Sequence, residues 1–129
     1  MIESPVPPHT GSPATFDPDE VRALTAAGSP VRLPAQWAFI HEHTPSDAAY
    51  LILDGTAAVF RGRRPVATLG PGDLVGEGGF VFGTLRNATV ASRARVAAVR
   101  IDYADLAALC DAHPGLGRRI AELGQRRAA

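Results

Sequence analysis

Turn residues divide the middle of the chain into short apolar or alternating runs. The runs cover residues 31–33, 37–40, 50–53, 56–60, 65–69, 88–91 and 96–101. Segments rich in Gly, Pro and Asp, such as 44–47, 54–55 and 70–73, lie between them. Runs this short are typical of strands, and the gaps between most of them are too short for the helices of βαβ units. The pattern therefore predicts an all-β sandwich, jelly roll or barrel.

A helix is expected before the strands, over residues 16–27. Asp17 is the predicted N-cap, and Glu20 follows at the spacing of a capping box. Gly28 supplies the stop, because glycine accepts the backbone conformations that end helices.

Two helices are expected after the strands. Asp102 is predicted to cap the first, over Tyr103–Ala112, and the second begins at Pro114 and runs for about twelve residues. The apolar positions of the second helix are Leu116, Ile120 and Leu123. We expect this apolar face to pack on the domain, and it is also a candidate seam for a homodimer.

The first fifteen residues are rich in proline and have no periodic apolar pattern. Such a composition cannot bury enough surface to offset its ordering entropy, so a disordered tail over residues 1–15 is expected. One domain then covers residues 16–129. The tail lacks the basic start and apolar stretch of a signal peptide, and no apolar run approaches a membrane span. We therefore expect a cytoplasmic protein without membrane association.

All 13 basic residues are arginine, and they balance 13 acidic residues. A dedicated nucleic-acid binder normally has a strong basic excess, so a net charge of zero argues against that class. Residues 1–60 carry two Arg against seven Asp and Glu, whereas residues 61–129 carry eleven against six. An anionic ligand is therefore expected in the second half. The absence of lysine beside abundant Ala, Arg and Gly suggests a GC-rich bacterial genome.

The stretch that carries the chemistry is residues 70–90, which read GPGDLVGEGGFVFGTLRNATV. Its glycines let a backbone approach a ligand closely and point successive N–H groups at an anion. A short helical turn over residues 79–82 would add the positive end of a helix. Arg86 can offer a planar fork to two oxygens of one phosphate, and Glu77 can accept a hydrogen bond from a neighbouring hydroxyl. A phosphate beside a hydroxyl describes a nucleotide.

At these residues the sequence resembles the cyclic nucleotide-binding domains of the catabolite-activator and protein-kinase-regulatory-subunit type. Gly76-Glu77 and residues 86–90, RNATV, match the phosphate-binding cassette of that family. Residues 41–55, HEHTPSDAAYLILDG, resemble another signature of the family. The resemblance implies an eight-stranded, jelly-roll-like β-roll with an N-terminal helix and C-terminal helices, an α+β arrangement that is mainly β.

The resemblance also implies a ligand site. Arg86 would neutralise the exocyclic phosphate, Glu77 would hold the ribose 2′-hydroxyl, and backbone N–H groups around Gly79 would bind phosphate oxygens. The expected ligand-binding residues are Gly76, Glu77, Gly78, Gly79, Arg86, Asn87 and Ala88 of the cassette, with Val59 and Leu69 as apolar walls. No metal ion or cofactor is expected, and the ligand is a cyclic nucleotide.

Some positions depart from the family pattern. His43 takes the place of a turn glycine, where a positive φ would strain a His side chain. Asn87 replaces the Ser, Thr or Ala that often helps separate guanine from adenine nucleotides. Arg61 is expected at a solvated hairpin tip with Arg63 and Arg64. Because the last helix is short, a residue capping the base is expected from a partner subunit or not at all.

Two other interpretations are open at this point. In one, the chain is a degenerate β-roll that serves as a protein–protein interaction scaffold, with its pocket empty or filled by another anion; Arg86 is then a structural arginine, for which an internal carboxylate such as Glu77 is a candidate partner. In the other, His41 and His43, with Asp47, begin a cupin-type metal site. A cupin needs another His near residues 72–80, and the sequence has none there, so a metal enzyme is disfavoured.

The favoured function is a stand-alone cyclic nucleotide sensor that is not an enzyme. No nucleophile and base stand in a recognisable catalytic setting. cAMP is favoured over cGMP as the ligand. Binding would tighten the cassette around the phosphate and re-pack the C-terminal helices. This would change the surface that contacts a separate effector protein. The expected partners are thus a cyclic nucleotide and an unidentified effector, with neither nucleic acid nor membrane.

Overall fold

The structure is a computed structural model that describes residues 16–128, so the expected tail lies outside the described residues. Eight strands form two antiparallel four-stranded sheets, in the orders β1-β8-β3-β6 and β2-β7-β4-β5. The elements are α1 (Pro18–Ala27), β1 (Ser29–Leu33), β2 (Ala38–Ile40), β3 (Ala48–Asp54), β4 (Ala57–Arg61), β5 (Arg64–Leu69), β6 (Leu74–Val75), α2 (Gly78–Phe82), β7 (Thr89–Ser92), β8 (Val96–Asp102), α3 (Tyr103–Ala112) and α4 (Pro114–Ala128).

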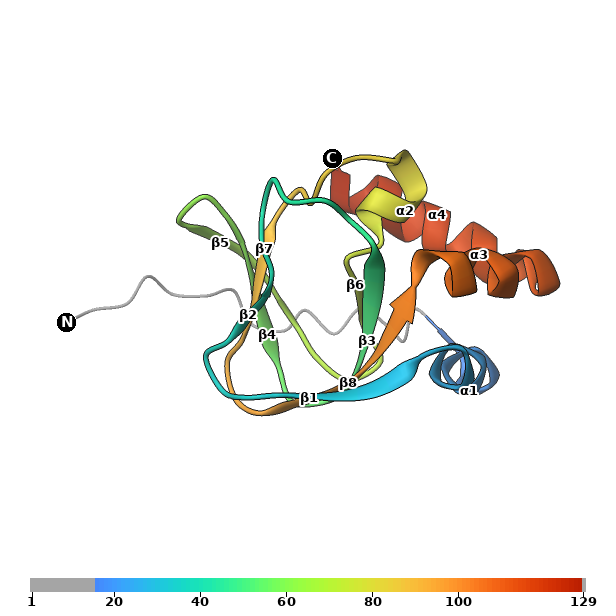
Figure 1. Cartoon of the computed structure of the whole chain (residues 1–129), viewed down its shortest axis with the longest axis horizontal. Coiled ribbons are helices and arrows are strands. Elements are labelled where there is room, and N and C mark those ends of the chain that lie inside the picture. The colour runs from blue at the N-terminus through green and yellow to red at the C-terminus, as the bar shows by residue number, and fades with distance from the viewer. Residues whose placement is uncertain (1–15, 129) are drawn as a thin grey trace.

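The two sheets face each other as a β-roll, and α1, α3 and α4 gather beside the sheet that contains β3 and β8 (Figure 1). This confirms the expected mainly-β roll with helices at both ends. Seven strands lie where the runs predict them. The eighth, β6, has only two residues and is defined by its pairing with Tyr50 and Leu51 of β3. A two-residue strand has no alternation that a sequence pattern could show.

The capping box of α1 is confirmed. The Asp17 side chain accepts a hydrogen bond from Glu20 N at 2.8 Å, and the Glu20 side chain accepts one from Asp17 N at 3.0 Å. The helix ends at Gly28, where a Cβ would lie 2.5 Å from the carbonyl oxygen of Arg100 on β8. Glycine is therefore required there by the close approach of two backbones.

Asp102 is the N-cap residue of α3, as predicted, but its side chain does not make the capping hydrogen bond. α3 begins at Tyr103 as expected, but no hydrogen bond joins the Asp102 side chain to the helix backbone. Its carboxylate accepts from the guanidinium of Arg100 instead, and the N–H of Tyr103 donates to the carbonyl oxygen of Asp47 at 3.0 Å. A charged donor two residues away on the same strand face competes better for a carboxylate than a backbone N–H does.

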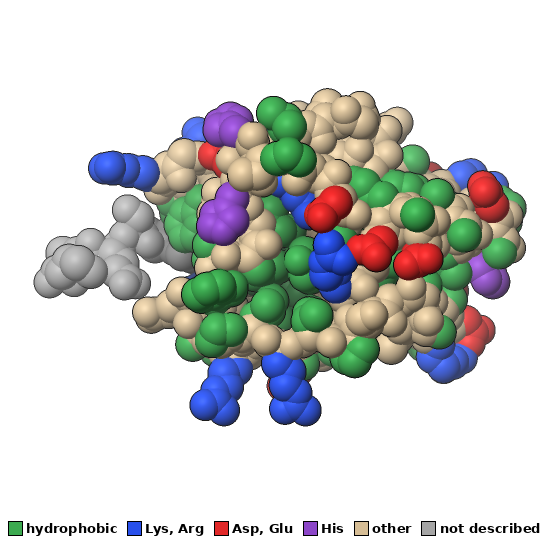
Figure 2. Space-filling model, viewed as in Figure 1, with side chains coloured by type: hydrophobic (Ala, Val, Ile, Leu, Met, Phe, Trp, Pro, Cys, Tyr) green, Lys and Arg blue, Asp and Glu red, His purple; other side chains and the backbone are tan. Residues whose placement is uncertain are grey.

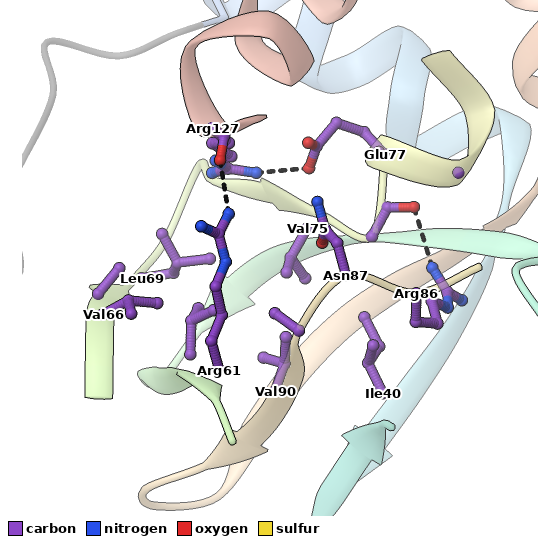
Figure 3. A pocket seen from close by; sticks show the side chains of 16 residues that line it. Ile40, Arg61, Val66, Leu69, Val75, Glu77, Arg86, Asn87, Val90 and Arg127 are labelled. Carbon is purple, nitrogen blue, oxygen red and sulfur yellow. Dashed lines mark hydrogen bonds and ion pairs between the residues drawn. The ribbon is translucent and has the colours of Figure 1, made fainter. Parts of the chain in front are cut away.

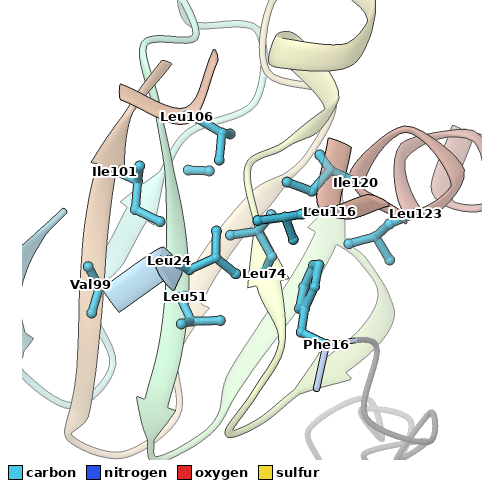
Figure 4. Close-up of a cluster of buried hydrophobic side chains, with 11 residues drawn as sticks. Phe16, Leu24, Leu51, Leu74, Val99, Ile101, Leu106, Leu116, Ile120 and Leu123 are labelled. Atoms are coloured by element: carbon cyan, nitrogen blue, oxygen red, sulfur yellow. The ribbon is translucent and has the colours of Figure 1, made fainter. Parts of the chain in front are cut away.

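Two apolar clusters build the core. One fills the space between the helices and the outer face of the β3–β8 sheet (Figure 4) and contains Leu24, Leu51, Ile101, Leu106, Leu116, Ile120 and Leu123. The other lies between the sheets and contains Ile40, Ile52, Leu69, Val75, Val90 and Val96. β3 and β8 contribute to both clusters, which explains their nearly unbroken apolar runs. The apolar stripe of α4 is therefore used for packing within the chain.

Candidate ligand-binding site

The segment from Gly76 to Ala88 forms a loop around the single turn of α2, which confirms the short helix predicted there. We call this segment the cassette. Gly76 has a φ of 85° and Gly83 a φ of 66°, both in the left-handed region that favours glycine. The N–H of Gly83 donates to the carbonyl oxygen of Gly79 at 2.8 Å and closes the turn. Glycines therefore shape both ends of the cassette helix.

The loop that precedes β3 packs directly against the cassette. The N–H of His43 donates to the carbonyl oxygen of Arg86, and the N–H of Arg86 donates to that of Thr44, both at 2.8 Å. A Cβ on Gly79 would lie within 3.0 Å of the Ser46 side chain. His43 has a φ of 68°, which confirms the expected positive φ at this position. Backbone hydrogen bonds thus hold the cassette against this loop, and the packing at Gly79 leaves no room for a Cβ.

A cavity of about 250 Å³ lies between the cassette and the inner faces of β4 and β5. All nine residues expected to bind ligand are on its wall. The remaining lining residues are Ile40, Arg61, Val66, Ala67, Val75, Val90 and Arg127. Figure 2 shows hydrophobic side chains lining a hollow in one face of the molecule, with basic and acidic side chains beside it. The fold brings together residues from positions 40 to 127.

The cavity has two chemically different ends (Figure 3). The cassette end carries Glu77, Arg86 and Asn87 together with the glycine backbone. The opposite end is walled by Val66 and Leu69 of β5 and their apolar neighbours. A ligand with a charged part and a flat apolar part matches this division.

Arg86 is buried, with 7% of its surface exposed, and its guanidinium joins three elements. Nη2 donates to the carbonyl oxygen of Ala48 at 2.7 Å, and Nη1 donates to that of Gly76 at 3.0 Å. Nη1 also lies 3.3 Å from the Tyr103 hydroxyl, and the Asp47 carboxylate is 3.6 Å from Nη2. The side chain therefore ties β3 and α3 to the start of the cassette, besides placing a positive charge on the cavity wall.

Tyr103 completes this junction. Its hydroxyl donates to the carbonyl oxygen of Gly76 at 2.5 Å, and its ring lies against Phe80 of α2. Burial raises the pKa of the Tyr103 hydroxyl, although the charge of Arg86 acts in the opposite direction. The hydroxyl consequently keeps its proton, and its role as a donor, at neutral pH.

Glu77 is almost fully buried, and its partner is Arg127 near the end of α4. Arg127 Nη1 lies 2.5 Å from Glu77 Oε1 and also donates to the carbonyl oxygen of Leu74 at 2.5 Å. Arg61 at the end of β4 donates from Nη2 to the carbonyl oxygen of Arg127 at 2.8 Å. Figure 3 shows these two arginines approaching one another over the cavity. The Glu77–Arg86 ion pair weighed from the sequence is therefore not formed.

Residues 30–113 match the protein family described as the cyclic nucleotide-binding domain, well over half of the chain. The chain belongs to the cyclic nucleotide-binding domain family. The matched residues include the cassette, β2 to β8 and nearly all of β1, whereas α4 lies beyond them. Among curated proteins, no sequence matches this chain significantly.

Solved structures share the roll of this cyclic nucleotide-binding domain. The Thermus thermophilus catabolite activator protein aligns with a TM-score of 0.77 at 25% identity over 88% of this chain. The alignment covers 55% of that protein, so this chain spans about half its length. A structure described as Sp-2Cl-cAMPS bound to PKAR CBD2 gives a TM-score of 0.70 at 20% identity, over 85% of this chain and 76% of that one.

A third similar structure comes from work on a cyclic-GMP-dependent signalling pathway that regulates bacterial phytopathogenesis. It aligns with a TM-score of 0.77 at 17% identity, over 88% of this chain and 94% of that one. At these two lower identities the likeness shows the fold alone. The domain thus shares its fold with a protein solved with bound Sp-2Cl-cAMPS and with one from work on a cyclic-GMP-dependent pathway.

Of the seven cavity residues that sequence reasoning missed in this cyclic nucleotide-binding domain, two are charged, Arg61 and Arg127. The expectation that Arg61 decorates a solvated hairpin tip is wrong, because its side chain reaches α4. Its spacing from Val59 on the same strand could have indicated this, since residues two apart share a strand face. Nothing near Arg127 in the sequence signals its contact with a carboxylate fifty positions earlier.

Within residues 16–128, no group of three or more His, Cys, Asp or Glu side chains is arranged to hold a metal ion. His41 and His43 are both exposed on the loop after β2. None of the helices described in the structure combines the length and apolar character needed to cross a membrane.

Proposed function

We propose that this cyclic nucleotide-binding domain is a sensor module that takes a cyclic nucleotide into the cavity beside the cassette. One observation carries the proposal: Glu77, Arg86 and the glycine backbone share a single cavity with an apolar wall from β4 and β5. A charged phosphate, a ribose hydroxyl and a purine ring need these three kinds of surface within one small volume. We propose no catalytic role for these residues.

The orientation of the ligand follows from the two ends of the cavity. The exocyclic phosphate would take the cassette end, where backbone N–H groups around Gly79 and the charge of Arg86 favour an anion. The ribose 2′-hydroxyl would donate to the Glu77 carboxylate, and the purine would lie against Val59 and Leu69. cAMP is our first candidate and cGMP the second.

Signalling would pass from the cassette to α4. Val81 of α2 packs on Gly124 of α4, where an added Cβ would meet the Val81 side chain at 2.9 Å. Because the two helices touch so closely, a movement of the cassette on ligand binding would displace the end of α4. The outward face of α4 is polar and exposed at Arg118, Glu122 and Arg126, so an effector meeting this face would be polar too.

A second candidate function is a protein–protein interaction scaffold that binds no nucleotide. The observation in its favour is that both charged groups of the cavity already have partners within the chain. Arg86 donates to Gly76 and Ala48, and Glu77 pairs with Arg127. A cavity whose charges are satisfied internally can persist for structural reasons alone.

Isothermal titration calorimetry separates the two functions. Purified protein is titrated with cAMP, cGMP and AMP, and each mixture is then analysed by chromatography for hydrolysed nucleotide. The sensor function predicts micromolar or tighter binding of a cyclic nucleotide, much weaker binding of AMP, and no hydrolysis. Absence of binding by all three nucleotides to folded protein would favour the scaffold.

A further inference from the structure

The last turn of α4 is fastened across the mouth of the cavity by Arg127. Its guanidinium reaches both the Glu77 carboxylate and the carbonyl oxygen of Leu74, each at 2.5 Å. Arg61 holds the same turn from the other side, through the carbonyl oxygen of Arg127 at 2.8 Å. We call these four residues, Arg61, Leu74, Glu77 and Arg127, the clasp. The clasp joins β4, β6, the cassette and α4, and Figure 3 shows its three charged side chains, Arg61, Glu77 and Arg127, beside one another.

The ion pair inside the clasp is shielded from water. The Glu77 side chain is 5% exposed and that of Arg127 is 28% exposed. A nearly buried carboxylate needs a partner, because leaving it alone is costly in a medium of low polarity. In the described part of the chain, Arg127 is the cation within ion-pair distance of Glu77. The last turn of α4 is therefore held in place by an ion pair to Glu77, whose carboxylate faces the ligand cavity.

The size of the cavity agrees with an obstruction at its mouth. Its volume of about 250 Å³ falls below the roughly 300–1,000 Å³ that is common for small-molecule sites. Arg61 and Arg127 both contribute to its wall. Release of the last turn of α4 would remove Arg127 from that wall and enlarge the space.

We propose that Arg127 is an internal competitor that occupies the hydroxyl position of the ligand site, so that nucleotide entry releases the end of α4. This inference rests on the proposed function, since it assigns Glu77 to the ribose hydroxyl. A guanidinium and a hydroxyl both donate to a carboxylate, and Arg127 already takes Glu77 Oε1. In this proposal the ligand hydroxyl displaces Arg127 from Glu77, and the clasp converts ligand binding into movement of the last turn of α4.

Removal of Arg127 should change nucleotide affinity in opposite directions, depending on whether Arg127 competes with the ligand or contacts it. If Arg127 held the ligand, its removal would weaken binding. If Arg127 competes with the ligand, its removal leaves the Glu77 carboxylate buried without a cation. A hydrogen bond from the ligand hydroxyl then supplies the missing partner, which strengthens binding. We expect Arg127→Ala and Arg127→Gln to bind cAMP or cGMP about tenfold more tightly than the wild type. The matched control is Arg126→Ala, which removes the same charge from an exposed neighbour on α4.

Calorimetry with the ribonucleotides and their 2′-deoxy forms gives the first readout. A ligand without the 2′-hydroxyl cannot donate this hydrogen bond to Glu77, so the two Arg127 variants should gain little affinity for the 2′-deoxy nucleotides. Unchanged or weaker ribonucleotide binding by both variants, when the wild type binds, overturns the inference and leaves the proposed function intact. If neither the wild type nor the variants bind any nucleotide, both proposals fall together. Binding by the variants alone supports the competitor.

Hydrogen exchange of the ligand-free protein gives the second readout. The amides in the last turn of α4 should exchange about tenfold faster in Arg127→Ala and in Glu77→Gln, and at the wild-type rate in Arg126→Ala. Saturating nucleotide should speed exchange of the same amides in the wild type. Equal exchange in all ligand-free proteins would show that the clasp does not hold α4 and would overturn the inference.

Discussion

Glu77 and Arg86 line the same cavity but do not bond to each other. Arg86 donates to the carbonyl oxygens of Gly76 and Ala48, whereas Glu77 pairs with Arg127. The two charges therefore hold different parts of the domain. Arg86 fastens the cassette to β3 and α3, and Glu77 fastens it to the end of α4. Either residue can be altered without removing the partner of the other.

Replacing Arg86 with Lys should affect stability and ligand binding together. A lysine ammonium cannot span the carbonyl oxygens of Ala48 and Gly76 as the guanidinium fork does. We expect Arg86→Lys to lower the free energy of unfolding by about 1–2 kcal/mol and cyclic nucleotide affinity about tenfold. Urea denaturation and calorimetry measure the two effects. Arg100→Lys is the control, because Arg100 forms more exposed ion pairs and should cost less than about 0.5 kcal/mol.

The two neighbouring glycines of α2 should respond differently to alanine. A Cβ on Gly79 would collide with Ser46 and lie 2.9 Å from the carbonyl oxygen of Thr84, whereas one on Gly78 would meet only the Asn87 side chain at 3.3 Å. Gly79→Ala should lower the free energy of unfolding by about 1–3 kcal/mol, and Gly78→Ala should change it by less than about 0.5 kcal/mol. Equal stability of the two variants in urea would contradict the close packing of the cassette.

The Tyr103 hydroxyl should matter up to strongly alkaline pH. Tyr103→Phe removes the bond to the Gly76 carbonyl oxygen and should cost about 1 kcal/mol at neutral pH. Because burial raises the pKa of Tyr103 above the ordinary tyrosine value of 10.0, the folded state holds the proton more tightly than the unfolded chain does. This stability is fully present below about pH 10 and is lost as the pH rises through the folded-state pKa.

Thermal unfolding near neutral pH and above about pH 10 tests both parts of this prediction. The wild type should lose more of its stability at high pH than Tyr103→Phe does, so the two melting temperatures should converge. A constant difference between them over this range would contradict the raised pKa of the Tyr103 hydroxyl in the folded state.

His43 should be a site where glycine stabilises the protein. Its φ of 68° is costly for a residue with a Cβ, and the backbone bond from its N–H to Arg86 does not need the side chain. We expect His43→Gly to be neutral or to stabilise by up to about 1 kcal/mol. His41→Gly, on the same loop, should instead destabilise by about 0.5–1 kcal/mol through the entropy of the unfolded chain. Urea denaturation measures the free energy of unfolding of both variants. If His43→Gly lowers it as much as His41→Gly does, the backbone at His43 is not strained.

Several parts of this domain could be predicted because their cause is local. The capping box at Asp17 and Glu20, the positive φ of His43 and the turn of α2 each depend on residues that are neighbours in sequence. The short runs between turn residues indicated seven strands for the same reason. β6 was not predicted, because its two residues form a strand only through their pairing with β3.

The amino-acid sequence by itself indicated seven of the strands, the capping box of α1 and the glycine-rich cassette, because turn chemistry, alternation and glycine spacing act over short distances. Its resemblance to the family added the eight-stranded roll and nine of the sixteen residues that line the cavity. The tertiary structure alone decided which partner each long charged side chain takes. Arg127 reaches Glu77, Arg61 reaches the backbone of α4, and the Asp102 side chain pairs with Arg100 instead of accepting a hydrogen bond from the backbone of α3. A flexible side chain pairs with whichever opposite charge or carbonyl oxygen lies within a few ångströms. That proximity is set by the packing of segments far apart in the chain.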